Sequence, residues 1–151
     1  MRLWNLATRT EIQAPPQNHV RLGQVTCALW LYRPNENDEI LCYGTSLGYT
    51  VFWGRKPEGK GPDVFCEIYT QRCAEKEIMC MTTRSSGADG TCLVVGTRDS
   101  IVQAWKVGSV VENLFSVKLP KTVPSAVAFA ENGKDIILFG REDGIMCVWI
   151  L

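Results

Sequence analysis

The chain has 151 residues, with 16 Lys and Arg against 16 Asp and Glu, so its formal net charge is zero. A balanced charge argues against a nucleic-acid partner, because proteins that bind nucleic acid need a basic excess. With 46% hydrophobic and 21% charged residues, the composition excludes a disordered chain. The longest apolar run, Ile145–Leu151, is too short to cross a membrane, and we expect no membrane partner.

Short apolar runs bounded by turn residues follow one another along the chain and predict β-strands. The first two runs occupy residues 2–6 and 9–13. The later ones, in chain order, are Val25–Trp30, Ile40–Tyr43, Tyr49–Trp53, Val64–Tyr69, Ile78–Met81, Cys92–Val95, Ile101–Trp105, Val111–Val117, Ala126–Phe129, Ile136–Phe139 and 145–151. No stretch shows a sustained 3.6-residue apolar period with caps, so helices are nearly absent from the prediction.

An internal repeat organises these strands. The windows Gly44–Trp53, Gly96–Trp105 and Gly140–Trp149 align without gaps, and each begins with Gly and ends with Trp. Trp4 ends a fourth, partial window, so the tryptophans recur at intervals of 49, 52 and 44 residues. In each unit Gly with Asp or Ser supplies a tight turn between two strands. With one strand before and one after, the unit is a four-stranded antiparallel sheet of roughly 40–50 residues, and radially stacked sheets of this kind form a β-propeller.

The repeat resembles the WD-repeat (WD40) β-propeller family. Residues 125–137 are similar to its first-strand, turn and second-strand passage, and each Gly-to-Trp window is similar to its second-to-third-strand hairpin. Asp99 and Asp143 match the family's turn aspartate, but Leu47 takes that place in the first window. No Trp is followed by Asp, and the family's Gly-His pair is missing. The family's His-Asp-Ser/Thr-Trp hydrogen-bond network therefore cannot be complete, and we expect these sheets to rely on packing.

The resemblance implies an all-β chain, a partial propeller of about three blades. Residues 1–13 are expected to form the third and fourth strands of a split blade, 24–70 and 76–118 two blades, and 124–151 three strands of the last blade. Closed propellers have four to eight blades. The chain is therefore either a fragment of a longer propeller, or copies assemble. In the second case strand 9–13 of one chain completes the last blade of the other, and two chains form a homodimer that closes the ring.

The tryptophans and the turn aspartates are expected to be structural anchors of the repeat. Large aromatic side chains between adjacent blades bury much apolar area, and we interpret them as packing residues and not as a ligand cage. These anchors are Trp4, Trp53, Trp105, Trp149, Asp99 and Asp143.

No catalytic, cofactor-binding or metal site is predicted. Gly44–Gly48 matches the G-x-S-x-G pattern of hydrolases, but a strand follows it where those enzymes have a helix, so we interpret it as a hairpin turn. His19, the single histidine, lies in a Pro- and Asn-rich segment that predicts a surface loop. One histidine and no C-x-x-C pair argue against a zinc site. We expect a protein without enzymatic activity.

The cysteines point to a reducing compartment. Seven are present, an odd number, and most lie inside apolar runs, as Cys27 and Cys80 do. A disulfide framework would place an even number in loops, whereas a buried reduced cysteine behaves as a small apolar residue. We therefore expect the protein in the cytoplasm or nucleus.

One surface is a candidate for binding protein partners. In the family, turns between the second and third strands line the partner-binding face, and here those turns carry Ser46, Arg98 and Glu142, with Tyr49 close by. Arg, Tyr and carboxylate side chains suit a protein-binding hot spot, although the same residues also occur on ordinary hairpin surfaces. The leading hypothesis is a self-assembling, non-enzymatic scaffold for protein–protein interaction. The alternatives are a propeller module that binds a small ligand or glycan, and a fragment of a longer WD-repeat protein without a function of its own.

Overall fold

The structure is a computed structural model of the chain. It describes residues 1–33, 38–55, 64–85, 90–120, 122–130, 135–140 and 146–150. The predicted site residue Glu142 and the predicted anchor Asp143 lie outside these ranges, and the side chain of Trp149 is likewise not among the described parts.

The described residues form antiparallel sheets, which confirms the predicted all-β class. The strands are β1 (Leu3–Asn5), β2 (Thr10–Ile12), β3 (Val25–Arg33), β4 (Asp38–Thr45), β5 (Tyr49–Arg55), β6 (Phe65–Arg72), β7 (Ile78–Ser85), β8 (Thr91–Thr97), β9 (Ile101–Val107), β10 (Val111–Lys118), β11 (Pro124–Phe129), β12 (Asp135–Gly140) and β13 (Met146–Ile150). Strands β3–β6 and β7–β10 make four-stranded sheets, β11–β13 a three-stranded sheet, and β1–β2 a hairpin, each in sequence order.

A one-turn helix, α1 (His19–Leu22), replaces the loop predicted around His19. Asn18 caps it, since its side-chain oxygen accepts a hydrogen bond from the backbone N–H of Arg21. Gly23 ends it with a φ of 85°, in the region that favours glycine. A single turn is too short to produce an apolar period, so the only local signal for this helix is its caps.

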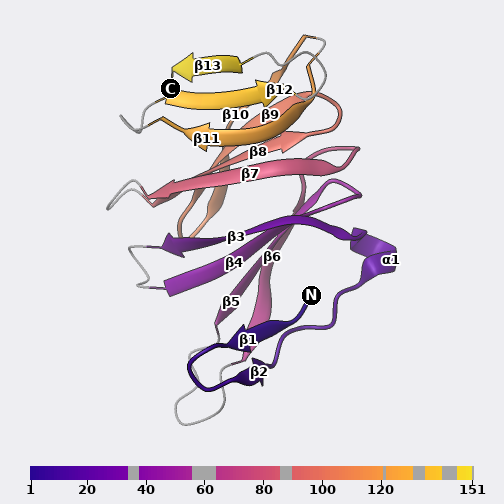
Figure 1. Cartoon of the computed structure of the whole chain (residues 1–151), viewed down its shortest axis with the longest axis vertical. Helices are drawn as coiled ribbons and strands as arrows, with labels where there is room; N and C mark the ends of the chain where they lie inside the picture. The colour runs from indigo at the N-terminus through magenta and orange to yellow at the C-terminus, as the bar shows by residue number, and fades with distance from the viewer. Residues whose placement is uncertain are drawn as a thin grey trace.

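The sheets stack face to face, and their first strands lie side by side (Figure 1). Strand β3 packs beside β7, and β7 beside β11, so these strands line one side of the stack. The sheets do not close into a ring. The β1–β2 hairpin lies at the far side of the β3–β6 sheet, and Gln13 forms a parallel bridge to Val64 just before β6.

Among the described residues, three apolar cores fill the spaces between these layers. The first lies between sheets β3–β6 and β7–β10, the second between β7–β10 and β11–β13, and the third between β3–β6 and the N-terminal segment. Their buried members are Leu31, Ile40, Cys42, Phe52, Ile78, Leu93, Val95 and Val107; Cys80, Val94, Val102, Ala104, Leu119, Val127 and Ile136; and Leu22, Leu41, Tyr43, Val51, Trp53 and Phe65. Sheets covered on both faces explain why the strands are near-continuous apolar runs.

The glycine that opens each window allows neighbouring sheets to approach. A Cβ atom on Gly44 would lie 2.5 Å from Cγ2 of Ile78, the first residue of β7. A Cβ on Gly96 would lie 2.9 Å from Cγ of Pro124, the first residue of β11. In both windows the first residue therefore lies against the first residue of the next sheet. A side chain there would clash with that sheet, which explains why glycine recurs at this position.

The window tryptophans differ in burial. Trp53 is 1% exposed in the third core, with its ring 5.2 Å from that of Tyr43 in an edge-on contact, and Trp105 packs against the first core. Nε1 of both indoles is buried without a hydrogen-bond partner in the described part of the chain. This agrees with the expected reliance on packing. Trp4, on the β1–β2 hairpin, is 53% exposed.

Candidate functional site

The turns β4–β5 and β8–β9 have the same build. Each is a three-residue hairpin loop whose last residue is left-handed, with φ of 79° at Gly48 and 65° at Ser100. The N–H of this residue donates to the carbonyl of Thr45 in the first turn (3.2 Å) and of Thr97 in the second (3.1 Å). A strand follows each turn, so the G-x-S-x-G segment is a hairpin and the hydrolase interpretation is excluded for it.

Ser46 and Arg98 occupy equivalent positions in these turns, and each binds the residue that precedes the first strand of its own sheet. The N–H of Ser46 donates to the carbonyl of Gln24 (2.8 Å), and its hydroxyl accepts from the N–H of Gln24 (3.0 Å). The N–H of Arg98 donates to the carbonyl of Glu77 (2.9 Å). Its Nε and Nη2 both lie 2.8 Å from Oε2 of Glu77. These bonds hold the turns in one conformation.

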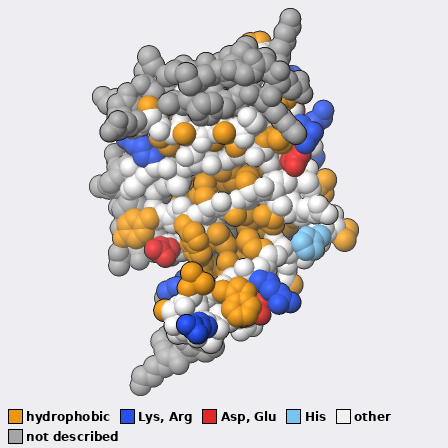
Figure 2. All heavy atoms as spheres, viewed as in Figure 1, with side chains coloured by type: hydrophobic (Ala, Val, Ile, Leu, Met, Phe, Trp, Pro, Cys, Tyr) orange, Lys and Arg blue, Asp and Glu red, His pale blue; other side chains and the backbone are white. Residues whose placement is uncertain are grey.

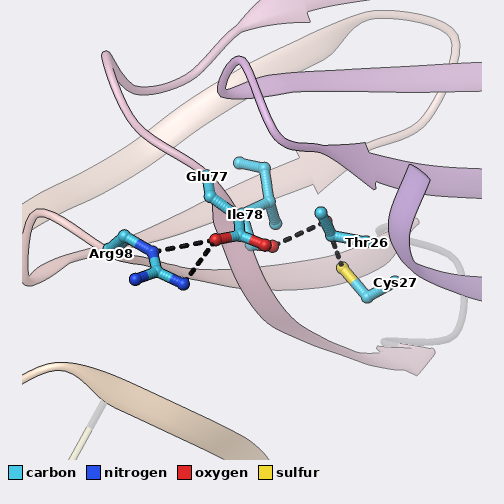
Figure 3. A network of polar contacts seen from close by, with 5 residues as sticks. All are labelled: Thr26, Cys27, Glu77, Ile78 and Arg98. Carbon is cyan, nitrogen blue, oxygen red and sulfur yellow. Dashed lines mark hydrogen bonds and ion pairs between the residues drawn. The ribbon is translucent and has the colours of Figure 1, made fainter. Parts of the chain in front are cut away.

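Glu77 also lies beside the connection between two sheets (Figure 3). The hydroxyl of Thr26, on β3, donates to the carbonyl of Ile78 at 2.6 Å and contacts Sγ of Cys27 at 3.8 Å. Burial, only partly offset by hydrogen bonding, raises the pKa of the Cys27 thiol. The network thus links an exposed ion pair to a bond between the two sheets.

Tyr49 begins β5 and is half-buried against the third core. The guanidinium carbon of Arg72 lies 5.9 Å from the centre of its ring, within the range of a cation–π contact. The hydroxyl of Thr45 accepts from the N–H of Tyr49 (3.1 Å) and fixes the start of the strand.

A hollow of about 480 Å³ separates the end of β6 from the β8–β9 turn. Its lining residues are Arg72, Cys73, Ala74, Glu75, Asp99 and Ile101. The carboxylate of Asp99, predicted as a structural anchor, accepts a hydrogen bond from the hydroxyl of Thr97. Residues 73–77 join the two turns. At one end the N–H groups of Cys73 and Ala74 both donate to the carbonyl of Gly48 (2.8 and 3.2 Å), and at the other end Glu77 binds Arg98.

We call this surface the turn face. It consists of Ser46, Tyr49, Arg72, Glu75, Glu77, Arg98 and Asp99. Three of the four predicted binding residues, Ser46, Tyr49 and Arg98, lie on it, and Glu142 is outside the described residues. Arg72, Glu75 and Glu77 were missed because they lie outside the repeated windows, and the charged run 75–77 was the only signal in the sequence for the two glutamates.

The six cysteines whose side chains the structure describes, all but Cys147, are free thiols. Burial raises the pKa of Cys42 well above its ordinary value and that of Cys80 to about 12. It also raises the pKa of Cys73 and of Cys92. A thiol with a raised pKa is protonated and a poor nucleophile.

Within the described residues no three His, Cys, Asp or Glu side chains are arranged to hold a metal ion. Among the helices of the described segments, none is long and apolar enough to span a membrane.

Comparison with known proteins identifies the fold. No protein-family model matches the chain, and no curated protein matches its sequence. Among solved structures, a chain of "Crystal Structure of Mitotic Checkpoint Complex" matches with a TM-score of 0.69 and 18% identity, over 99% of this chain and 40% of that one. The Cps50 (Swd1) beta-propeller domain of Myceliophteria thermophila matches with a TM-score of 0.65 and 16% identity, over 94% of this chain and 45% of that one.

The chain therefore has the β-propeller fold, and the predicted resemblance to WD-repeat propellers is confirmed at the level of the fold. It spans less than half the length of each of these two chains. At this level of identity the comparison shows the fold alone, and function has to be argued from the surface.

Proposed function

We propose that this chain is a non-enzymatic scaffold that binds protein partners through the turn face. The observation that carries the proposal is that Arg72 and Asp99 line a hollow on the rim of the stacked sheets, with Tyr49 against Arg72 and Arg98 beside Asp99 in the same turn. Arginine and tyrosine are enriched among residues that dominate binding energies. The propeller fold of a chain from a mitotic checkpoint complex agrees with a role in assemblies.

The turns are braced by hydrogen bonds, which favours binding. The Ser46 and Arg98 backbones are held by hydrogen bonds to Gln24 and Glu77, so little conformational entropy is lost when a partner docks. The Arg98 side chain is still 50% exposed and retains N–H groups that can bind a partner carboxylate.

The test is quantitative affinity purification of the chain and of the variant Arg72→Ala/Arg98→Ala from the same cells. Lys106→Ala is the matched control, because Lys106 is exposed and lies at the opposite end of β9 from the turn face. We expect the double variant to lose partners that the control retains, by about tenfold or more. Equal recovery of every partner by all three proteins would contradict the proposal, provided that both variants are folded in the absence of urea.

We also propose that copies of the chain associate through the outward face of β3. Ala28, Trp30 and Tyr32 alternate along this strand and are exposed, Trp30 by 51% and Tyr32 by 41%. Trp30 pairs with Leu41 of β4, and the centre of its ring lies 5.8 Å from that of Phe65. Leu41 and Phe65 belong to the third core, so the exposed residues of β3 lie on the same face of the sheet that the N-terminal segment covers. In the described part of the chain, no further sheet lies on this face of β3.

The exposed apolar strip is wider than one strand. Trp4 and Leu6 on the neighbouring hairpin are 53% and 87% exposed, and Figure 2 shows hydrophobic side chains gathered across the middle of this side of the molecule. Apolar surface of this extent usually marks an interface. A homodimer that covers it is the second part of the proposed function.

Sedimentation of the full chain tests this association. We expect a dimer or larger assembly at micromolar concentration and a monomer for Trp30→Glu, because the charge would have to be buried in the interface. Leu114→Glu is the matched control, since Leu114 is equally exposed, at 51%, on β10. A monomer for the unmodified chain, or an unchanged assembly for Trp30→Glu, would refute self-association without affecting the turn-face proposal.

A further inference from the structure

The opposite end of the same strands carries a second concave site. Between the β3–β6 and β7–β10 sheets, where β3 and β9 end, a pocket of about 380 Å³ opens to the surface. Its lining residues are Arg33, Ile40, Phe52, Ile68, Tyr69, Val107, Gly108, Ser109, Val110 and Val111. Neither the repeated windows nor the turn face includes this pocket as a whole, and nothing in the proposed scaffold function uses it.

The walls of the pocket are mostly apolar. Ile40, Phe52 and Val107 form a buried floor and belong to the first core, each exposed by 2% or less. Ile68 and Val110 at the rim are 43% and 73% exposed. Volumes of about 300–1,000 Å³ with mostly apolar walls are typical of small-molecule sites. The volume lies near the lower limit, which suits a ligand of one ring or one branched chain.

One charged side chain lines the pocket. Arg33 is the only charged side chain among its lining residues, and none of them is acidic. A guanidinium carries five N–H donors in a planar fork, so it can bind a carboxylate while it keeps contacts elsewhere. Charge complementarity therefore favours a ligand with one carboxylate.

The turn from β9 to β10 leaves the pocket open. A Cβ atom on Gly108 would meet no atom within 4 Å, in contrast to Gly44 and Gly96, whose Cβ atoms would clash with the next sheet. The N–H of Gly108 donates to the carbonyl of Val110 (3.2 Å), which holds the turn in place. The space beside Gly108 is therefore not required for packing of the sheets.

From this geometry we propose that the pocket binds a small monocarboxylate with an aromatic or branched apolar body. The body lies on Phe52, Val107 and the rim residues, and the carboxylate accepts hydrogen bonds from Arg33. The site is independent of the turn face, so a ligand and a protein partner can bind the chain at the same time.

Titration of the full chain with 3-phenylpropionate and with its neutral amide tests the proposal without altering the protein. Backbone amide resonances in NMR spectra report the site. We expect the acid to bind with a dissociation constant on the order of 1 mM or tighter and to shift the resonances of Gly108, Val110 and Val111. The amide should bind about tenfold or more weakly, because it lacks the charge-assisted bond to Arg33.

Gly108→Leu should fill the pocket and weaken binding of the acid by about tenfold or more, and Lys106→Ala, next to the pocket but not part of its lining, should leave it unchanged. Equal affinities for acid and amide, unchanged affinity in Gly108→Leu, or no resonance shifts at concentrations on the order of 10 mM would overturn the proposal. If Gly108→Leu does not fold, the comparison of acid and amide on the unmodified chain decides. None of these outcomes depends on the turn-face proposal.

Discussion

Replacement of Gly44 by alanine tests how the sheets are packed against each other. The new Cβ atom would lie 2.5 Å from Cγ2 and 2.6 Å from Cβ of Ile78, and 2.9 Å from Sγ of Cys27. Ile78 is fully buried and begins β7, so it cannot swing away as an exposed side chain would. The clash therefore has to be relieved by separating β7 from the β3–β6 sheet.

The magnitude follows from two opposing effects. Inserting a methyl group into a well-packed core costs about 1–3 kcal/mol. Replacing glycine by alanine also removes conformational freedom from the unfolded chain, which stabilises the protein by about 0.4–1 kcal/mol. We therefore expect Gly44→Ala to lower the free energy of unfolding by roughly 1–2 kcal/mol.

The assay is urea unfolding followed by tryptophan fluorescence, with Gly108→Ala as the matched control. A methyl group on Gly108 meets no atom within 4 Å, so this variant should be as stable as the unmodified chain, or more stable by up to about 1 kcal/mol. If Gly44→Ala unfolds at the same urea concentration as Gly108→Ala, the close approach of the two sheets at Gly44 is refuted.

Three further predictions concern the contacts between and within the sheets. Thr26→Val removes the hydroxyl that donates to the carbonyl of Ile78 at 2.6 Å, and should destabilise the chain by about 1–2 kcal/mol in urea unfolding; no loss would mean that this bond is replaced by water. Burial raises the pKa of the Cys80 thiol to about 12. Because the folded value exceeds the unfolded one, this thiol stabilises the fold below about pH 9, and the contribution is lost as the pH rises towards 12, by about 1.4 kcal/mol per pH unit. Cys80→Ala should therefore show a shallower decline of stability over this range, and equal slopes for the two proteins would contradict the assignment. Arg98→Ala breaks an exposed ion pair with Glu77 and should cost only about 0.2–1 kcal/mol, less in high salt; a larger loss would show that Arg98 is needed for folding.

The strands could be predicted because their signals are local. Each Gly-to-Trp window contains its own turn residues, and apolar runs bounded by turns indicate strands whatever they pack against. The one-turn helix at His19–Leu22 was not predicted, since four residues cannot display a helical period.

The candidate site was predicted only in part. Ser46 and Arg98 could be placed on one rim because they share a position in the repeat. The residues that complete the turn face, Arg72, Glu75 and Glu77, come from the end of β6 and the connection to β7. Strand pairing within each sheet and the stacking of the sheets together bring them to these turns.

The sequence by itself determined the repeating unit, its four strands and its turns, because apolar runs and turn chemistry involve only a few neighbouring residues. Only the tertiary structure decided what each repeated position contacts. Gly44 meets Ile78, Thr26 bonds to the same residue, and the pocket at Arg33 and Gly108 lies where two sheets diverge. These partners are separated by 34 residues or more in the chain, and no short-range pattern encodes the distance between two packed sheets.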